Sequence, residues 1–157
     1  MLALKVTNDE LKNFMSKLLK EETFDFFEVR SAEISMHFNV KIDGFLNKDL
    51  LSDDEQCTER SYILWSEARP LVFDFIKGKI KPKSIKVVLS LPKEEALNLH
   101  KNASAYFVNI LFENDSVMIT TAASEKVFSM DKSVISSFND YVIELLNHSG
   151  IICELAV

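Results

Sequence analysis

The first periodic segment of the chain predicts an amphipathic helix. Five apolar residues repeat there at helical intervals: Leu11, Phe14, Met15, Leu18 and Leu19. Thr7 and Glu10 stand before them at the spacing of a capping box, in which each residue bonds the backbone of the other. We therefore expect a helix over residues 7–22, preceded by a short strand over residues 2–6.

The next segment alternates between apolar and polar residues. Its apolar positions are Ala32, Ile34, Met36, Phe38, Val40 and Ile42. Such alternation predicts strands with one buried face. A loop with an odd number of residues centred on Asn39 keeps these side chains on one side of the sheet, and we favour it over a competing turn at Asp43 and Gly44. The acidic residues 49–59 are then an exposed loop.

A strand and a second helix are expected next. Residues 60–65 suit the strand, and Ser66 is a suitable N-cap for the helix. The apolar face of this helix consists of Ala68, Leu71, Val72, Phe75 and Ile76. Pro70 then falls in the first turn, where its missing N–H removes no intrahelical hydrogen bond, and Gly78 suits the end of the helix.

The second half of the chain contains the same types of element. The expected strands lie at residues 84–92, 105–114, 116–122 and 125–130, and Pro92 opens a short helix. Asn114 with Asp115, and then Ala123 with Ser124, are the expected turns. A last helix over residues 132–147 is followed by Gly150, and the apolar tail 151–157 is compatible with an edge strand of undetermined position.

Together these elements predict a single α+β domain in which amphipathic helices cover an antiparallel sheet. The order of strand, helix, antiparallel strands and helix occurs twice, which divides the chain into half-units at residues 1–80 and 84–157. This order is similar to that of DNA sliding clamp domains. Residues 87–128 resemble such a half-domain most, with residues 2–19 as the counterpart in the first half. The resemblance implies association with DNA.

Several short sequences resemble an uncharacterised family of Gram-positive bacterial proteins known only as a domain of unknown function. They are "FDFFEV" (24–29), "WSEARP" (65–70), "IKGK" (76–79), "SIKVVLSL" (84–91) and "FSMDKS" (128–133). The resemblance covers nearly the whole chain. It implies a bacterial cytoplasmic protein and supplies no activity, ligand or catalytic residue.

Composition adds an uneven distribution of charge. Hydrophobic residues make up 47% of the 157 residues and include twelve Phe, which is typical of a folded domain with a substantial core. The net charge is -6, but residues 75–93 contain six lysines and no acid, so this segment carries +6 and the rest of the chain -12. An anionic partner responds to such a local field more than to the net charge.

Five lysines in this segment are therefore candidate DNA-binding residues: Lys77, Lys79, Lys81, Lys83 and Lys86. A structural explanation is also available for them. Lys77 and Lys79 lie where the negative end of the preceding helix dipole favours cations, and the others would belong to a solvated linker.

The sequence contains none of the common catalytic or cofactor motifs. Its three glycines are isolated, so no phosphate-binding loop, dinucleotide fingerprint or nucleophile elbow is present. The histidines and cysteines show no zinc-site spacing, and Cys57 lies among acids that disfavour a thiolate. We therefore predict no catalytic residue, metal or cofactor. Two free thiols, together with the lack of a signal-peptide pattern and of a membrane-length apolar run, predict a cytoplasmic protein that does not enter a membrane.

Trp65, Glu67 and Arg69 form the remaining candidate site. Glu67 suits the first turn of a helix, and Arg69 has the chemistry to stack on Trp65 or to pair with a carboxylate across the fold. We expect a structural clamp between strand and helix, with a ligand-binding arginine as the alternative.

The leading functional hypothesis is a non-enzymatic intracellular module that binds a protein partner or a second copy of itself. The alternative is a clamp-like protein that associates with DNA through the segment from Lys77 to Lys86. A third hypothesis is an enzyme with a pocket near Trp65, Glu67 and Arg69.

Overall fold

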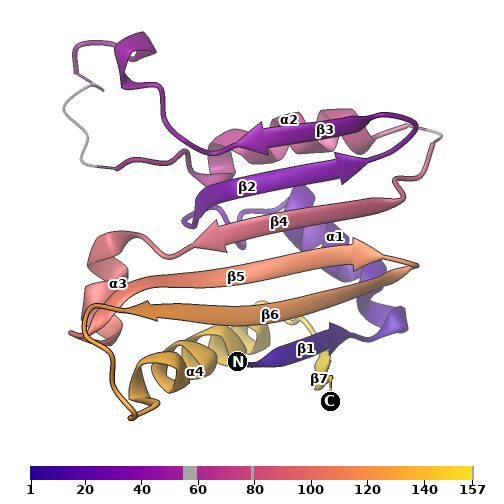
Figure 1. Cartoon of the computed structure of the whole chain (residues 1–157). Helices are drawn as coiled ribbons and strands as arrows, with labels where there is room; N and C mark the ends of the chain where they lie inside the picture. Colours follow the sequence, from indigo (N-terminus) through magenta and orange to yellow (C-terminus); the bar gives the residue numbers. More distant parts are fainter. Residues whose placement is uncertain (55–59, 79, 157) are drawn as a thin grey trace.

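Seven antiparallel strands form one sheet in the computed structural model, which describes residues 1–54, 60–78 and 80–156 (Figure 1). The strands are β1 (Ala3–Val6), β2 (Glu28–Ser35), β3 (Asn39–Asp43), β4 (Ser84–Ser90), β5 (Ala103–Glu113), β6 (Ser116–Glu125) and β7 (Cys153–Leu155). Their order across the sheet is β3-β2-β4-β5-β6-β1-β7, so β5 is the central strand. The first-half strand β1 pairs with β6, and β2 pairs with β4, so both halves of the chain contribute to one sheet.

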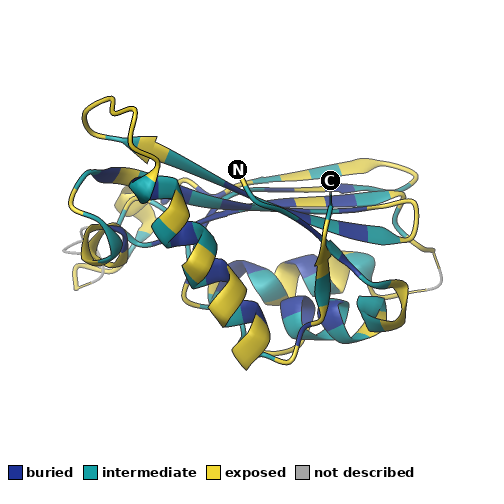
Figure 2. Cartoon of the chain, turned by 90° about the horizontal axis from the view of Figure 1, so that it is seen from below, coloured by how far each residue is buried: buried dark blue, intermediate teal, exposed yellow. Residues whose placement is uncertain are grey.

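The helices lie on one side of this sheet (Figure 2). They are α1 (Leu11–Leu19), α2 (Trp65–Ile76), α3 (Lys93–Leu99) and α4 (Ser133–His148), with 3₁₀ turns at Asn8–Glu10 and Lys48–Leu50. Helix α3 packs beside β5 and α4. In the described parts of the chain, every helix is too short or too polar to cross a bilayer. The α+β class and the antiparallel sheet are confirmed.

The core lies between the sheet and the helices because alternate strand residues point toward the helices. In β5 these residues are Tyr106, Val108, Ile110 and Phe112, and all are buried. The Tyr106 ring stacks on Phe138 of α4 with the ring centroids 4.6 Å apart, and its hydroxyl donates a hydrogen bond to the Val134 carbonyl. This partner satisfies the one polar group that the buried tyrosine brings into the core.

The β2–β3 hairpin places its apolar residues on one side of the sheet, as expected, but its loop is centred on a different residue. Ser35 pairs with Asn39 and Ile34 with Val40, which leaves a three-residue loop centred on His37. The odd length and the common side of the apolar residues are confirmed, whereas the centre at Asn39 is wrong. Asn39 belongs to β3, where its side chain accepts a hydrogen bond from the Ser35 hydroxyl across the strand pair.

Strand β6 is longer than expected. Asn114 and Asp115 form the predicted turn, with φ values of 53° and 58°. The predicted turn at Ala123 and Ser124 and the third strand over residues 125–130 are wrong. Ala123 and Ser124 continue the pairing of β6 with β5, because β5 is long enough to offer partners for them.

Helix starts were the least predictable boundaries. Helix α2 begins at Trp65, so the expected strand over 60–65 is reduced to isolated bridges and Ser66 is not the N-cap. Glu67 accepts a hydrogen bond from the Leu64 N–H and closes the first turn, which places Pro70 beyond that turn inside the helix. Thr7 likewise makes no side-chain cap, and α1 begins at Leu11 after a 3₁₀ turn.

The C-terminal elements agree with the sequence pattern. Helix α4 occupies nearly the predicted range, and Gly150 follows it with φ of 72°. The tail forms β7, which pairs with β1 at the edge of the sheet. The edge strand left open by the sequence pattern therefore has a defined place.

Gly44 is predicted to be the glycine on which stability depends most. A Cβ atom at Gly44 would overlap the carbonyl oxygen of Val29. Since that oxygen belongs to a buried backbone, Gly44→Ala should lower the free energy of unfolding by about 3 kcal/mol. Gly150→Ala is the control, because it meets no atom within 4 Å and has only its positive φ to oppose it. It should cost about 1 kcal/mol in urea denaturation, and equal losses for both variants would contradict the steric account.

Candidate functional site

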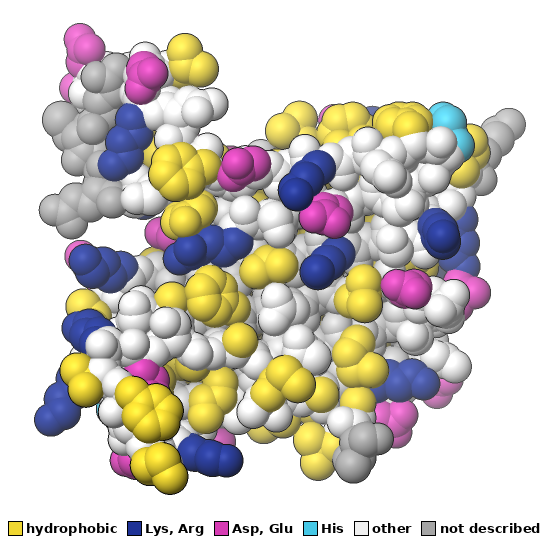
Figure 3. Space-filling view, in the orientation of Figure 1, with side chains coloured by type: hydrophobic (Ala, Val, Ile, Leu, Met, Phe, Trp, Pro, Cys, Tyr) yellow, Lys and Arg dark blue, Asp and Glu magenta, His cyan; other side chains and the backbone are white. Residues whose placement is uncertain are grey.

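The face of the sheet opposite the helices, called the open face below, carries both apolar and charged side chains. The described helices leave it uncovered (Figure 2), and Figure 3 looks onto it. Its central strands contribute partly exposed apolar residues: Val88, Phe107, Leu111, Met118 and Ala122. Charged residues lie toward both edges: Lys41, Glu33, Lys86, Lys5 and Glu154. This arrangement of apolar centre and charged margin is common in protein interfaces.

Arg30 marks one end of the open face and was missed by the sequence interpretation. The register between β2 and β4 shifts between Val29 and Ser31, which leaves Arg30 as the extra residue of a β-bulge. The Arg30 Nε donates to the Ser90 hydroxyl over 3.0 Å, and its Nη1 donates to the Tyr62 hydroxyl over 2.9 Å. A guanidinium with these bonds is held in one position.

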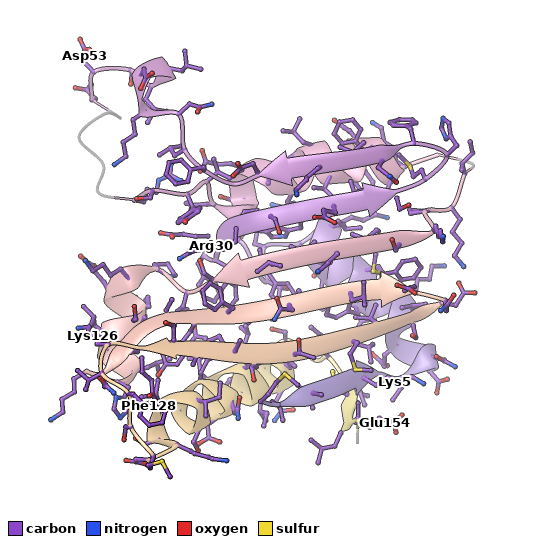
Figure 4. The ribbon with its side chains drawn as sticks, viewed as in Figure 1. Lys5, Arg30, Asp53, Lys126, Phe128 and Glu154 are labelled. Carbon is purple, nitrogen blue, oxygen red and sulfur yellow. The ribbon has the colours of Figure 1, made fainter. Side chains whose placement is uncertain are left out.

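Aromatic rings flank the same guanidinium (Figure 4). The Arg30 Cζ lies 4.0 Å from the centroid of the Tyr62 ring and 5.2 Å from that of Phe107. The sequence does contain a signal for this bulge, because the apolar Val29 is separated from the apolar Ala32 by two polar residues, which breaks the alternation of a regular strand. Reading that break in the period of two would have placed Arg30 and Ser31 on the open face.

A groove of about 860 Å³ lies beyond the start of β2. It is lined by Phe26, Glu28, Arg60, Pro92, Lys93, Glu94, Glu95 and Tyr141. Burial raises the pKa of Glu28, while the charges of Arg30 and Arg60 act to lower it. The pKa of Tyr141 is also raised, by burial and then by Glu95. The charges of this lining are mixed, so the groove does not select for one sign of ligand charge.

The described members of the lysine segment lie on several elements. Lys77 follows α2 and pairs with Asp74 over 2.9 Å, and Lys81 pairs with Asp115 in the β5–β6 turn. The Lys83 backbone N–H bonds the Ser35 carbonyl, and the exposed Lys86 lies on the open face. Lys79 is outside the described residues. Two of the four described lysines thus have carboxylate partners.

Trp65, Glu67 and Arg69 contact three different groups. The buried Trp65 donates its indole N–H to the Leu18 carbonyl of α1 over 2.8 Å. Glu67 pairs with Arg60, and this hydrogen bond is the main reason that its pKa is lowered. Arg69 binds Asp25 through two parallel hydrogen bonds of 2.7 and 2.8 Å.

The loop after β6 presents apolar side chains to solvent. Val127, Phe128 and Met130 are 70%, 84% and 87% exposed. Asn102 fixes the start of the loop, because its side chain donates to the Val127 carbonyl and accepts from the Val127 N–H. Figure 2 shows this loop rising above the sheet on the side away from the helices. We call residues 126–130 the apolar loop.

Candidate metal ligands do not gather in the described residues, where no group of three or more His, Cys, Asp or Glu side chains meets the geometry of a metal site. Cys57 lies outside the described residues. Cys153 is half-buried, and burial raises the pKa of its thiol to about 11, with a smaller effect of Glu10. His100 shares a hydrogen bond of 2.9 Å with the Ser133 hydroxyl at the start of α4.

The Asp25–Arg69 pair should contribute to stability as one unit. Both side chains are more than four-fifths buried, and their contact is bidentate. Asp25→Asn and Arg69→Gln should each destabilise the protein, and the double variant should lose less than the sum of the two. We expect a coupling energy of about 1–2 kcal/mol in a double-mutant cycle measured by urea unfolding. Additive losses would show that the pair is not a clamp.

Comparison with known proteins places the chain in a family without giving it an activity. The comparison with curated proteins gives no significant match, and neither does that with solved structures. A family model described as a family of unknown function matches residues 17–154, which include every element from β2 to α4, the end of α1 and most of β7. The chain therefore belongs to DUF5721, a family of unknown function.

Proposed function

We propose that this chain is a non-enzymatic binding module of the bacterial cytoplasm, and that its open face contacts a protein partner. The single observation that carries the proposal is the partly exposed apolar stripe across β4, β5 and β6 on a face that the helices leave free. Gathering partly exposed apolar side chains on one free face favours association, since a partner that covers them removes apolar area from water.

The chemistry of the stripe supports a protein partner. Phe107, Leu111 and Met118 are long, adaptable apolar side chains, and neighbouring small residues let a second surface approach the backbone closely. Arg30 adds a rigid cation between aromatic rings at the end of the stripe. Interfaces are enriched in arginine and aromatic residues, and Arg30 would lose little further freedom on binding because Ser90 and Tyr62 already hold its guanidinium.

A photo-crosslinking amino acid at position 111 should capture the partner in cells that produce the protein. We expect an adduct at Leu111 that disappears when Met118→Lys is introduced on the adjoining strand, because a charge there disrupts the apolar contact. Position 71 is the matched control, since Leu71 is an apolar residue that is 55% exposed on α2. Adducts of equal yield at both positions, or none at position 111, would contradict the proposal.

Association with DNA is a second proposal, supported by the five lysines between residues 77 and 86, which have no acidic residue among them. Lys83 and Lys86 are exposed, and among the described residues neither forms a salt bridge with a carboxylate, in contrast to Lys77 and Lys81. Phosphate contacts by these lysines would make affinity for duplex DNA fall with salt.

We do not propose a metabolite pocket at Trp65, Glu67 and Arg69, because the contacts described above engage all three.

A salt titration tests the second proposal. If Lys83 and Lys86 each neutralise a phosphate, Lys83→Ala with Lys86→Ala should reduce the slope of log affinity against log salt by about 2. Lys12→Ala, an exposed lysine on α1, is the control with an unchanged slope. Fluorescence anisotropy with a labelled duplex provides the measurement, and absence of binding at low salt would remove DNA as a partner.

A further inference from the structure

We propose that a second copy of this chain covers the open face, in a two-fold symmetric dimer whose axis runs along the central strand β5. This inference rests on the proposed function, since it names the partner of the same face. The observation behind it is the order of charges across the sheet. When two copies face each other about β5, positive side chains at one margin lie opposite negative side chains at the other.

One row of side chains crosses all seven strands of the open face. Each member is the register partner of the next: Lys41, Glu33, Lys86, Leu111, Met118, Lys5 and Glu154. Their chain neighbours pack toward the helices, as Ile34, Ile110 and Val117 do, so the row itself points away from them. Lys5 and Glu154 are labelled near one edge of the sheet in Figure 4.

A two-fold axis along β5 exchanges strands at equal distances from it. Three strands lie on each side, so β4 faces β6, β2 faces β1, and β3 faces β7 of the other copy. Glu33 then lies opposite Lys5, and Lys41 opposite Glu154, and each pair occurs twice. Leu111 meets its own copy at the axis. Every charge at the margins of this row is thus placed against an opposite charge.

The axes midway between β5 and its neighbours lack this complementarity, and an axis along β6 pairs only Lys86 with Glu154 while Glu33 and Lys41 face no strand. An axis between β5 and β6 sets Lys86 opposite Lys5, and Glu33 opposite Glu154. An axis between β4 and β5 sets Lys41 opposite Lys5. Like charges across an interface are unfavourable, and the β5 axis both avoids them in this row and pairs all four charges at its margins, so the row favours that axis.

The remaining contacts fit the same arrangement. Lys86 faces Met118, whose thioether can lie along the aliphatic stem of the lysine. A hollow of about 620 Å³ on the open face, lined in part by Glu33, Lys86 and Leu111, lies where the other copy places β6 and β1. The next row is uncharged across its inner strands: Ser31, Val88, Asn109, Thr120 and Ala3. Small side chains in this row permit close packing of two sheets.

The apolar loop extends the contact beyond the sheet. It follows β6 at the end of the sheet where β2 begins, and it rises on the side of the open face (Figure 2). The two-fold axis carries it to the β2 side of the other copy at the same end. Phe45, which is 60% exposed, lies there against Tyr62, with the ring centroids 5.5 Å apart. Phe128 of one copy thereby gains an aromatic partner on the other.

The available area matches what a stable dimer needs. Seven strands span about 29 Å, and the seven residues of β4 span about 24 Å, which gives about 700 Å² for each copy before the apolar loop is added. Standard interfaces bury about 800 Å² on each partner. The sheet face and the loop together are therefore large enough.

Charge reversal with rescue tests the arrangement. Sedimentation equilibrium should show the wild type as a particle of twice 17.9 kDa that dissociates on dilution. Lys5→Glu or Glu33→Lys alone should weaken the dimer about tenfold, because each places like charges at two symmetry-related contacts. The double variant should recover to within about threefold of the wild type, since the pairs are restored with reversed sign. Lys12→Glu on α1 is the matched control for the change in charge.

Two variants on the axis report its position. Glu113, the exposed last residue of β5, meets its own copy there, so Glu113→Gln should tighten the dimer by relieving a like-charge contact. Leu111→Cys, with Cys57 and Cys153 replaced by serine, should be joined to its copy by a short bismaleimide, because packed sheets lie about 10 Å apart, beyond the reach of a disulfide. Ser136→Cys on α4 should not be joined.

The outcomes separate this inference from the proposed function. A monomeric wild type at all concentrations, or a double variant as weak as the single ones, would overturn the dimer. If position 111 then still crosslinks to a protein of another mass, the open face binds a different partner and the proposed function stands. Thermal unfolding of each variant shows whether a loss of association is caused by a loss of folding. The Glu113→Gln variant should bind more tightly, and unfolding cannot produce such a gain.

Discussion

The structure depends on burying one face of a single antiparallel sheet. In a strand, successive side chains point to opposite faces, so a sheet covered by helices on one side needs an apolar residue at every second position. The inner strands β2, β4, β5, β6 and β1 meet this requirement apart from the bulge at Arg30, and their buried residues form one continuous core with Phe14, Trp65 and Phe138 from the helices. The other face follows from the same rule, since its residues are the ones that the core does not use.

The order of strands makes that core common to both halves of the chain. The hairpin β5–β6 and strand β4 lie between the first-half strands β2 and β1. Neither half of the sequence therefore keeps its own strands together. Hydrogen bonds cross the same boundary: the Asn13 side chain of α1 donates to the Gly150 carbonyl after α4, and the Leu2 N–H donates to the Thr121 hydroxyl of β6. The division into half-units at residues 1–80 and 84–157 stays a prediction from the order of elements along the sequence. In the structure, the two halves share one sheet and one core.

Features that depend on local periodicity were predictable from the sequence. The alternation in β2, β3 and β5, the Asn114–Asp115 turn and helix α4 all carry their signal within a few residues. Boundaries set by distant partners were not. Ala123 and Ser124 look like a turn in isolation, and they are strand because Tyr106 and Ala105 pair with them. The start of α2 depends in the same way on Glu67 reaching back to Leu64.

The candidate site was less predictable than the fold for a related reason. Charged residues such as Lys5 and Glu33 are far apart in sequence and unremarkable in composition, and only strand order places them in one row. Arg30 depends on a bulge, and the partners of Trp65 and Arg69 lie 47 and 44 residues away. The expectation of a structural clamp at Arg69 followed from general chemistry, yet its carboxylate, Asp25, could not be named without the fold.

The edges of the sheet bear on which surface is available for association. Open edges invite pairing with another chain through their unused backbone groups. Here one edge is β7, with only three residues, and the other is β3, with five residues and an exposed lysine at its centre. Short edge strands and edge lysines both oppose such pairing. With its edges protected and an apolar stripe left on the open face, the sheet associates through side chains rather than through backbone groups. Side chains can distinguish one partner from another, whereas backbone groups are the same in every chain.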